Sequence, residues 1–462
     1  MKIVYRFKQL VLLSGDLISF SLGFWISLAV RYFELPASDA INDKLSIFTI
    51  LFASWVVINF INGLYDLGTL KEKKHYLRLL ESATLSLFIS IFILYLTPNN
   101  QTTPKTILLL NIIFGFLICY LWRLIYAKFI IDKNLGSRVI FIGWNREINE
   151  LIEILSNHPE RGYQPVVVFD PNNKITGVVG ANITVYRQIQ SLRSAINAHE
   201  ANLIITEPQI QSEPQVLKEL YELLFWPVRI TELSAFYETI TGRVPPSTFS
   251  DTWFLGNLAN IDKPIYNRVK RFVDYVFAVI LGLILLLILP LIVLAIKFSS
   301  HGPIFFKQAR VGHFGAVFNI YKFRTMFVMA PDGSAEKNGA QFASKNDKRA
   351  TSVGKFLRKT RLDELPQVIN LFKGEITLIG PRPERPEIVA NLESQMPYYT
   401  LRHMVKPGIT GWAAIHQHYT DTLESTLKKL QFDLYYIKNR SILLDAIILL
   451  RTINVVMRMM GQ

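Results

Sequence analysis

Long apolar stretches alternate with short polar loops through the first part of the chain. The stretches cover residues 9–30, 46–65, 79–97 and 106–127. Each is close to the ~20 residues that a helix needs to cross the hydrocarbon core of a bilayer. The pattern therefore predicts a bundle of four membrane-spanning helices within residues 1–133.

Positive charge is distributed unequally around these stretches. Lysine and arginine gather before the first stretch, between the second and third, and after the fourth, whereas the 31–45 loop is mixed in sign and the 98–105 loop carries only Lys105. Because basic loops stay in the cytoplasm, the N-terminus and everything after residue 128 are predicted to be cytoplasmic. Asp16 lies inside the first stretch, where it either has a function in the membrane or pairs near an interface.

Residues 134–241 change to an alternation of short apolar runs and amphipathic segments. Strands are expected at 139–143, 166–170, 203–206 and 228–230, with helical periodicity at 148–155 and 214–225. This alternation is typical of a parallel sheet covered by helices, as in a Rossmann-like domain.

The phosphate-binding fingerprint of such a domain is incomplete. Only Gly143 occupies the turn after the first strand, and Trp144, Asn145 and Arg146 follow it, so the spacing G-x-G-x-x-G is not met. Asp170 stands where a ribose-binding acid would. Without the glycines this is a weak signal, and we expect a structural or regulatory domain in preference to a working cofactor site.

A fifth apolar stretch at residues 272–298 follows a linker predicted at 242–265. Read simply, it is another membrane-spanning helix, which would carry all later residues across the membrane. Basic residues flank both of its ends, however, and Pro290 lies in its second half. Proline removes a helical hydrogen bond and bends the chain, so these residues alone leave the course of the stretch open.

Two adjacent carboxylates, Asp363 and Glu364, lie among arginines and lysines. Pro366 fixes its own φ angle and disfavours a helical Leu365, so a helix is expected to begin here. The two acids would then lie at a helix N-terminus, where free amides favour negative charge. Two acids among cations can hold a metal and a phosphate together. The alternative is an N-capping aspartate with solvated neighbours.

Several further segments accompany this acidic pair in a fixed order. They are Lys270-Arg271-Phe272-Val273-Asp274, residues 303–312 (PIFFKQARVG), residues 321–326 (YKFRTM), Pro381-Arg382-Pro383 and residues 407–413 (PGITGWA). The series resembles the bacterial sugar transferases, that is, the polyprenyl-phosphate hexose-1-phosphate transferases or monotopic phosphoglycosyl transferases. The resemblance covers residues 264–462, and the preceding regions look like the large, membrane-anchored form of that family.

The resemblance implies an α-rich monotopic catalytic domain at residues 266–462. Its first helix, at about 270–298, would be re-entrant: it would enter and leave the membrane by the same face, with a break at Leu289-Pro290. The family often has serine before that proline, so Leu289 is a departure. This course keeps the catalytic domain on the cytoplasmic face, where nucleotide-sugars are found. The whole chain then combines a membrane helical bundle, a Rossmann-like α/β domain and this catalytic domain.

The resemblance also implies roles for individual residues. Asp363 would be the nucleophile that forms a covalent phosphosugar intermediate, and Glu364 would bind Mg²⁺. The candidates for holding substrate phosphates are Lys322, Arg324, Arg358 and Arg382, and those for supporting the site are Gln308, Arg310 and Asp433. The pattern departs after Trp412, because His416 and His418 stand near the place where the family often has Asn-Gly-Arg.

Composition agrees with a membrane enzyme of anionic substrates. Half of the residues are hydrophobic and the formal net charge is +14, which anionic lipids and diphosphate substrates explain without nucleic acid. The single cysteine, Cys119, excludes an intramolecular disulfide. The expected setting is a bacterial inner membrane, and the expected partners are a UDP-sugar, polyprenyl (undecaprenyl) phosphate, membrane lipids and a second copy of the chain. Two rival functions are a membrane glycosyltransferase that releases UDP and a non-enzymatic membrane scaffold or regulator.

Overall fold

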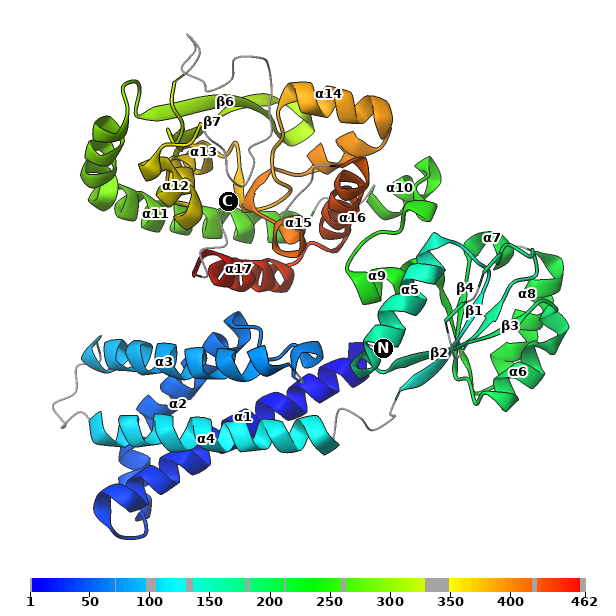
Figure 1. The fold of residues 1–462 in the computed structure, drawn as a ribbon, viewed down its shortest axis with the longest axis horizontal. Coiled ribbons are helices and arrows are strands. Elements are labelled where there is room, and N and C mark those ends of the chain that lie inside the picture. Colours follow the sequence, from blue (N-terminus) through cyan, green and yellow to red (C-terminus); the bar gives the residue numbers. More distant parts are fainter. Residues whose placement is uncertain are drawn as a thin grey trace. The chain divides into compact units, whose positions relative to one another are not determined.

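The structure is a computed structural model, and it divides the chain into two compact units, Met1–Ile240 and Thr241–Gln462. It describes residues 2–70, 72–96, 105–129, 136–177, 179–180, 183–211, 213–258, 263–328, 349–417 and 422–457. Figure 1 shows the elements of each unit.

The first unit begins with long helices, and these confirm the four predicted from the apolar stretches. They are α1 (Lys2–Tyr32), α2 (Ser38–Ile61), α3 (Lys73–Leu96) and α4 (Lys105–Phe129), with the short 3-10 helix η1 (Leu67–Thr69) after α2. All four are long and apolar enough to cross a membrane, and they pack against one another (Figure 1).

Small residues bring α1 and α4 close together. A Cβ atom added to Gly23 would lie 2.6 Å from the backbone of Gly115, so only glycine permits this approach, as is common where membrane helices cross. Asp16 of α1 forms a fully buried ion pair with Arg123 of α4. The pairing alternative for Asp16 therefore holds, and the pair fastens the same two helices.

The same unit contains the predicted Rossmann-like domain. Its strands are β1 (Ser137–Ile142), β2 (Tyr163–Phe169), β3 (Thr184–Tyr186), β4 (Leu203–Thr206) and β5 (Arg229–Glu232). They form one parallel sheet in the order β3-β2-β1-β4-β5. Its helices are α5 (Arg146–Asn157), α6 (Leu192–Ala198), α7 (Pro208–Gln211), α8 (Pro214–Glu222) and α9 (Leu233–Thr241). Apolar side chains cover both faces of the sheet, which is why its strands read as continuous hydrophobic runs.

The second unit is mixed α/β. Its helices are α10 (Asp251–Leu258), α11 (Pro264–Ser299), α12 (Ser352–Thr360), α13 (Val368–Lys373), α14 (Pro386–Gln395), α15 (Trp412–His416), α16 (Leu423–Asn439) and α17 (Ile442–Met457). Two 3-10 helices matter below, η7 (Leu362–Gln367) and η8 (Tyr399–Met404). Strands β6 (Phe305–Val311) and β7 (Val317–Phe323) pair antiparallel, and β8 (Thr377–Ile379) pairs parallel with β9 (Gly408–Thr410).

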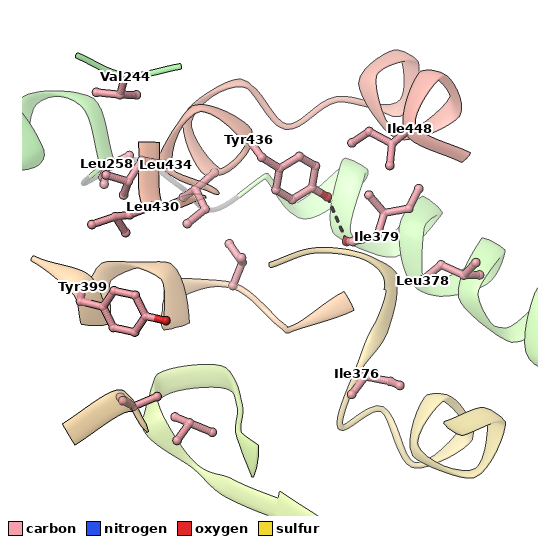
Figure 2. Close-up of a cluster of buried hydrophobic side chains, with 14 of the residues drawn as sticks. Val244, Leu258, Ile376, Leu378, Ile379, Tyr399, Leu430, Leu434, Tyr436 and Ile448 are labelled. Carbon is pink, nitrogen blue, oxygen red and sulfur yellow. Dashed lines mark hydrogen bonds between the residues drawn. The ribbon is translucent and has the colours of Figure 1, made fainter. Parts of the chain in front are cut away.

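The core of this unit gathers around α16 and β8. Figure 2 shows Leu430 and Leu434 of α16 beside Leu258, and Tyr436 of the same helix beside Ile379; Ile376 and Leu378 belong to the same core. The Tyr436 hydroxyl donates a hydrogen bond of 3.1 Å to the carbonyl of Ile379, drawn as the dashed line. Val244 and Leu258 belong to the same core (Figure 2). The segment that the sequence suggested as a linker is thus partly built into the second unit.

Helix α11 stays helical through Pro290, so the expected interruption of the helix at Leu289-Pro290 is absent, but the helix bends along its length (Figure 1). Both ends of α11 contact the folded domain that follows it. Near the N-terminal end, Asp274 accepts hydrogen bonds from the Leu378 amide and the Thr377 hydroxyl at 2.9 and 2.7 Å. After the C-terminal end, the carbonyls of Ser300 and His301 accept hydrogen bonds from one arginine of the same domain, Arg324, at 2.7 and 3.0 Å.

The middle of α11 exposes large apolar side chains. Leu286, Leu287 and Leu291 are 67%, 80% and 71% exposed, and the helix is the most hydrophobic of the candidate spans. Burial of such a face against lipid would remove a large apolar area from water. The helix therefore presents one side to its own domain and an apolar side outward.

Candidate active site

The acidic pair lies on η7, directly after α12. Arg361 joins the two elements in a left-handed conformation, with a φ of 59°. This conformation lets the chain turn sharply after α12, so that η7 packs against β7. The helical turn begins at Leu362 and includes Pro366, so the predicted helix start at Pro366 is a few residues too late. Asp363 and Glu364 lie inside the first turn.

Glu364 receives three cations on one carboxylate oxygen. Lys322 Nζ from β7 and Arg382 Nη2 from the loop after β8 each lie 2.9 Å from its Oε1. Arg361 Nη1 lies 3.6 Å from the same oxygen. Burial opposes ionisation of Glu364, but Arg382, Lys322 and Arg361 together hold its pKa well below the usual range. Glu364 is therefore a fixed negative charge.

Asp363 has the opposite electrostatic environment. Its side chain is 7% exposed, and its Oδ1 is buried with no hydrogen-bond partner in the described part of the chain. Burial raises the pKa of Asp363 to about 6, and the charge of Glu364 adds to that effect, although Lys322 opposes it. Buried polar atoms are nearly always bonded. A buried carboxylate oxygen without a partner, near the three cations of Glu364, is therefore suited to contact a bound ligand.

The other predicted phosphate-binding residues divide into two kinds. Lys322 and Arg382 lie at the acidic pair, and the Arg382 side chain is still 41% exposed. Arg358 of α12 is half-buried, its backbone carbonyl accepts from the Arg361 amide, and its side chain is not bonded to the acidic pair. Arg324 is buried and directed at the carbonyls that follow α11. The structure does not bring it to the acidic pair.

The predicted supporting residues contact the loop of Arg382 or the interior of the unit, and not the acidic pair. Arg310 contacts Gln308 Oε1 at 2.5 Å and the Pro383 carbonyl at 3.0 Å. Asp433 pairs with Arg402 in the buried interior of the unit, so it does not reach the acidic pair directly. His416 of α15 stacks on Phe432, and His418 lies outside the described residues.

Sequence reasoning assigned no role to two arginines of this region. Arg361 precedes Glu364 by three residues, a spacing at which side chains of a helical turn meet, and this signal was available. Arg402 lies far from the acidic pair in sequence and belongs to none of the quoted motifs. No local pattern marks it.

The acidic pair fits a divalent metal that the substrate helps to bind. The described residues contain no cluster of three or more metal-ligating side chains, which would be needed for a site made of protein alone. Magnesium commonly uses one or two carboxylates and takes its remaining ligands from phosphates and water. The orphaned Asp363 Oδ1 and the Oε2 of Glu364, to which none of the three cations is bonded, are suitable oxygens.

Comparison with known proteins identifies the family of the second unit. Residues 265–459 match the family model for bacterial sugar transferases. A glucose-1-phosphate transferase from Caulobacter vibrioides that uses UDP-glucose and undecaprenyl phosphate is 37% identical over 188 residues, 40% of this chain and 68% of that protein. The matching family model describes a sugar transferase, and five helices of this chain are long and apolar enough to cross a membrane. The chain belongs to the bacterial sugar transferase family.

Two further relatives cover different shares of the chain. A UDP-N-acetylgalactosamine-undecaprenyl-phosphate N-acetylgalactosaminephosphotransferase from Aeromonas hydrophila is 42% identical over 235 residues, 51% of this chain and 53% of that protein. A UDP-glucose:undecaprenyl-phosphate glucose-1-phosphate transferase from Escherichia coli is 29% identical over 411 residues, 86% of each chain. The chain thus spans about half the length of the first relative and most of the second.

Residues 60–232 match a family model described as a CoA-binding domain, but the Rossmann-like turn does not fit a diphosphate. A Cβ atom added to Gly143 would lie 2.5 Å from Glu207 Oε2, so this carboxylate fills the space in front of the turn. Asn145 donates to Glu207 at 3.1 Å and also caps α5 by accepting from the Ile148 amide at 2.9 Å. A diphosphate at this turn would meet a negative charge and an amide that is already bonded.

Proposed function

We propose that this protein transfers a sugar-1-phosphate from a UDP-sugar to polyprenyl phosphate, releases UMP, and so begins the assembly of a bacterial polysaccharide or glycan. The observation that carries the proposal is the unequal acidic pair, in which Glu364 is tied to cations and Asp363 has an oxygen without a partner. The activities for which the relatives from Aeromonas and Escherichia are named support the same reaction.

In the first step, an oxygen of Asp363 attacks the sugar-bearing phosphorus of the donor. The new bond is an acyl phosphate, and the bond from that phosphorus to the UMP oxygen breaks, so UMP leaves with the electron pair. In the second step, a phosphate oxygen of polyprenyl phosphate attacks the same phosphorus and releases the Asp363 carboxylate. Splitting the transfer in this way replaces one difficult step by two easier ones.

The cations around the pair counter the charge of the substrates. Lys322 and Arg382 are held by Glu364 with their side chains 20% and 41% exposed, so both can reach an approaching phosphate. Arginine can bind a phosphate through two nitrogens, whereas lysine acts as a point charge. Mg²⁺ bound through Glu364 would neutralise the charge that develops as UMP leaves.

The anchoring of α11 supports a position at the membrane surface. A straight helix of 36 residues is about 54 Å long at 1.5 Å per residue, long enough to carry one end well beyond a bilayer. Both ends of α11 are instead bonded to the domain that follows it. We infer that α11 enters and leaves by one face, with Pro290 in its embedded part, and that this face is cytoplasmic. A homodimer stays a prediction from the sequence.

The test is nucleotide release from the purified full chain in lipid nanodiscs, with undecaprenyl phosphate and a panel of UDP-sugars. Chromatography of the released nucleotide separates the candidate functions. UMP together with polyprenyl-diphosphate-sugar supports the proposal. Release of UDP would replace it with a glycosyltransferase, and no nucleotide release from any UDP-sugar in the panel would favour a scaffold or regulator.

A further inference from the structure

The loop that carries Arg382 has every backbone carbonyl bonded. Over four consecutive residues, the carbonyl of Pro381 accepts from the Gly408 amide at 2.9 Å, that of Arg382 from Arg402 Nη2 at 2.9 Å, that of Pro383 from Arg310 Nη1 at 3.0 Å, and that of Glu384 from the Val311 amide at 2.9 Å. The four donors come from three separate parts of the second unit: β9, η8 and the end of β6. Loops rarely have such complete bonding, because most loop carbonyls face water.

The backbone of this loop has little freedom of its own. Prolines at 381 and 383 fix their φ angles and lack amide hydrogens. The Gly408 contact depends on glycine, since a Cβ atom there would lie 2.1 Å from the Gly380 nitrogen. Two prolines and two backbone donors therefore restrict the loop, and two arginine side chains complete its support.

Arg402 is the more deeply buried of these two arginines. Its side chain is 1% exposed, and its Nε and Nη2 donate to Asp433 Oδ2 at 3.1 and 2.8 Å. Its Nη1 donates to the Tyr399 hydroxyl at 2.7 Å. Nη2 is thus the group that reaches both Asp433 and the Arg382 carbonyl.

A buried ion pair of this kind is poor evidence of a stabilising role. The cost of removing two charges from water often exceeds their attraction, and apolar residues can replace such pairs without loss of stability. Burial raises the pKa of Asp433, while Arg402 opposes that shift. The pair is more readily explained by the second bond of Arg402 Nη2, which holds the backbone carbonyl of Arg382, the residue that contacts Glu364.

Arg310 supports the next residue from the other side. It donates to the Pro383 carbonyl, lies 3.6 Å from Glu384 and is braced by Gln308. Glu384 is itself bonded by Lys429 of α16. Asp433 and Lys429 lie four residues apart, one helical turn, on that helix, so α16 holds both arginine supports in place.

We propose that Arg402, oriented by Asp433, is a positioning residue of the transfer reaction. It fixes the backbone of Arg382 so that the Arg382 guanidinium is set on Glu364 and toward the donor diphosphate before the substrate arrives. This inference rests on the proposed function. It assigns Asp433 to the alignment of a phosphate-binding arginine and not to a metal.

The test is a double-mutant cycle between Arg402→Lys and Arg382→Lys. Lysine at 402 keeps the charge and can pair with Asp433, but it cannot also reach the Arg382 carbonyl with fixed geometry. We expect Arg402→Lys to lower kcat/KM for UMP release by about tenfold, the value for one lost hydrogen bond to a charged group. Added to Arg382→Lys, the same change should cost less than about threefold, because the residue it positions is already altered.

A general structural role gives a different result. If Arg402→Lys only reduces the folded fraction, its loss multiplies with that of Arg382→Lys, and the positioning role is overturned. Arg243→Lys is the matched control, because Arg243 is also buried and contacts Gln431 of the same helix α16 at 3.3 Å. Its effect should multiply with that of Arg382→Lys.

A milder variant covers the case in which Arg402→Lys does not fold. Tyr399→Phe removes one Arg402 partner without changing any charge, and its smaller loss should vanish in the Arg382→Lys background. An undiminished loss there counts against the proposal. Failure of the proposed function is seen separately, because the wild-type chain would then release UDP or no nucleotide, whereas multiplying losses in a chain that releases UMP overturn the positioning role alone.

Discussion

Asp363 and Glu364 are neighbours in sequence but occupy opposite electrostatic states. Lys322 and Arg382 each lie 2.9 Å from Glu364 Oε1, whereas Asp363 has a buried Oδ1 without a hydrogen bond among the described residues. The cations therefore hold Glu364 ionised and lower the energy of an ionised Asp363 only from a distance. This asymmetry distinguishes the fixed charge of Glu364 from Asp363, the proposed nucleophile.

Replacement of Asp363 by asparagine should abolish transfer, because an amide cannot form the acyl phosphate. We expect UMP release to fall on the order of 10³-fold or more, as for loss of a covalent nucleophile. Intact-protein mass spectrometry during turnover without acceptor should show a hexose-phosphate adduct on the wild type and none on Asp363→Asn.

The matched control is Glu387→Gln, a change to an exposed acid of α14. It should retain activity and adduct. Asp363→Asn should also melt at a higher temperature at neutral pH, because the native state pays to ionise a carboxyl whose pKa is raised. An active Asp363→Asn enzyme would remove the nucleophile assignment.

The first half-reaction should depend on pH through Asp363. Its pKa is raised to about 6 by burial, and only the ionised form attacks, so the rate should rise as pH increases through about 6 and level off above it. Glu364 should not change the rate across this pH range, because its pKa is well below the usual value. Single-turnover UMP release without acceptor isolates this step from the ionisation of polyprenyl phosphate. A flat profile between about pH 5 and 7 would contradict the assignment.

Stability should change with pH in the opposite sense. Between the ordinary carboxyl pKa of 3.8 and the native value of about 6, the unfolded chain has already released the proton that the native chain still holds. The contribution of Asp363 to stability therefore falls as pH rises across that window. Thermal melting of wild type and Asp363→Asn should diverge as pH increases from 4 to 7.

Arg361 allows charge and backbone strain to be separated. It has a left-handed conformation that favours glycine and lies 3.6 Å from Glu364. Arg361→Gly should keep or raise the melting temperature while lowering kcat/KM by about threefold, the scale of a partly exposed ion pair. Arg361→Ala loses the same charge but keeps a Cβ atom, so it should be less stable than the glycine variant by about 1–2 kcal/mol. Equal stability of the two variants would show that the conformation is not strained.

Some of this architecture could be predicted from sequence, because it rests on local periodicity. The four N-terminal helices and strands β1, β2 and β4 follow mainly apolar runs, strand β5 follows the shorter pattern at 228–230, and the structure has all of them where these patterns occur. Strand β3, with three residues and partial exposure, has too little pattern to detect. The uninterrupted course of α11 through Pro290 was not predicted, because a proline signals a bend and cannot say whether hydrogen bonding resumes.

The residues of the site also divide into those that a local motif predicted and those that depend on contacts distant in sequence. Lys322, Asp363, Glu364 and Arg382 meet as the ordered motifs implied. Arg324 stands two residues from Lys322 in sequence, but it follows the end of β7 and binds the carbonyl of Ser300 after α11. Arg402 depends on contacts with residues 20 and 31 positions away, which no local pattern encodes.

Removal of divalent metal should stop the reaction without unfolding the protein. Glu364 and the substrate phosphates are the proposed ligands, so EDTA should abolish UMP release, Mg²⁺ should restore it, and the melting temperature should stay unchanged. Glu364→Gln should raise the half-saturating Mg²⁺ concentration by about tenfold, in the range for loss of a ligand-shell group, whereas Glu387→Gln should not. Full activity in a preparation shown to be metal-free would contradict a metal at this site.

The course of α11 can be tested with single cysteines at its two ends. Arg271→Cys and His301→Cys place exposed thiols before and after the apolar part, and the native Cys119 is buried and should not react. If α11 is re-entrant, a membrane-impermeant maleimide should label both positions in inverted vesicles and neither in intact spheroplasts.

Asn42→Cys, an exposed position near the start of α2, is the control from the opposite side, because the charge distribution predicts that the 31–45 segment lies outside the cytoplasm. It should be labelled in spheroplasts only. Labelling of Arg271→Cys and His301→Cys from different sides would make α11 a spanning helix, and it would then place the acidic pair on the periplasmic side, away from its nucleotide-sugar donor.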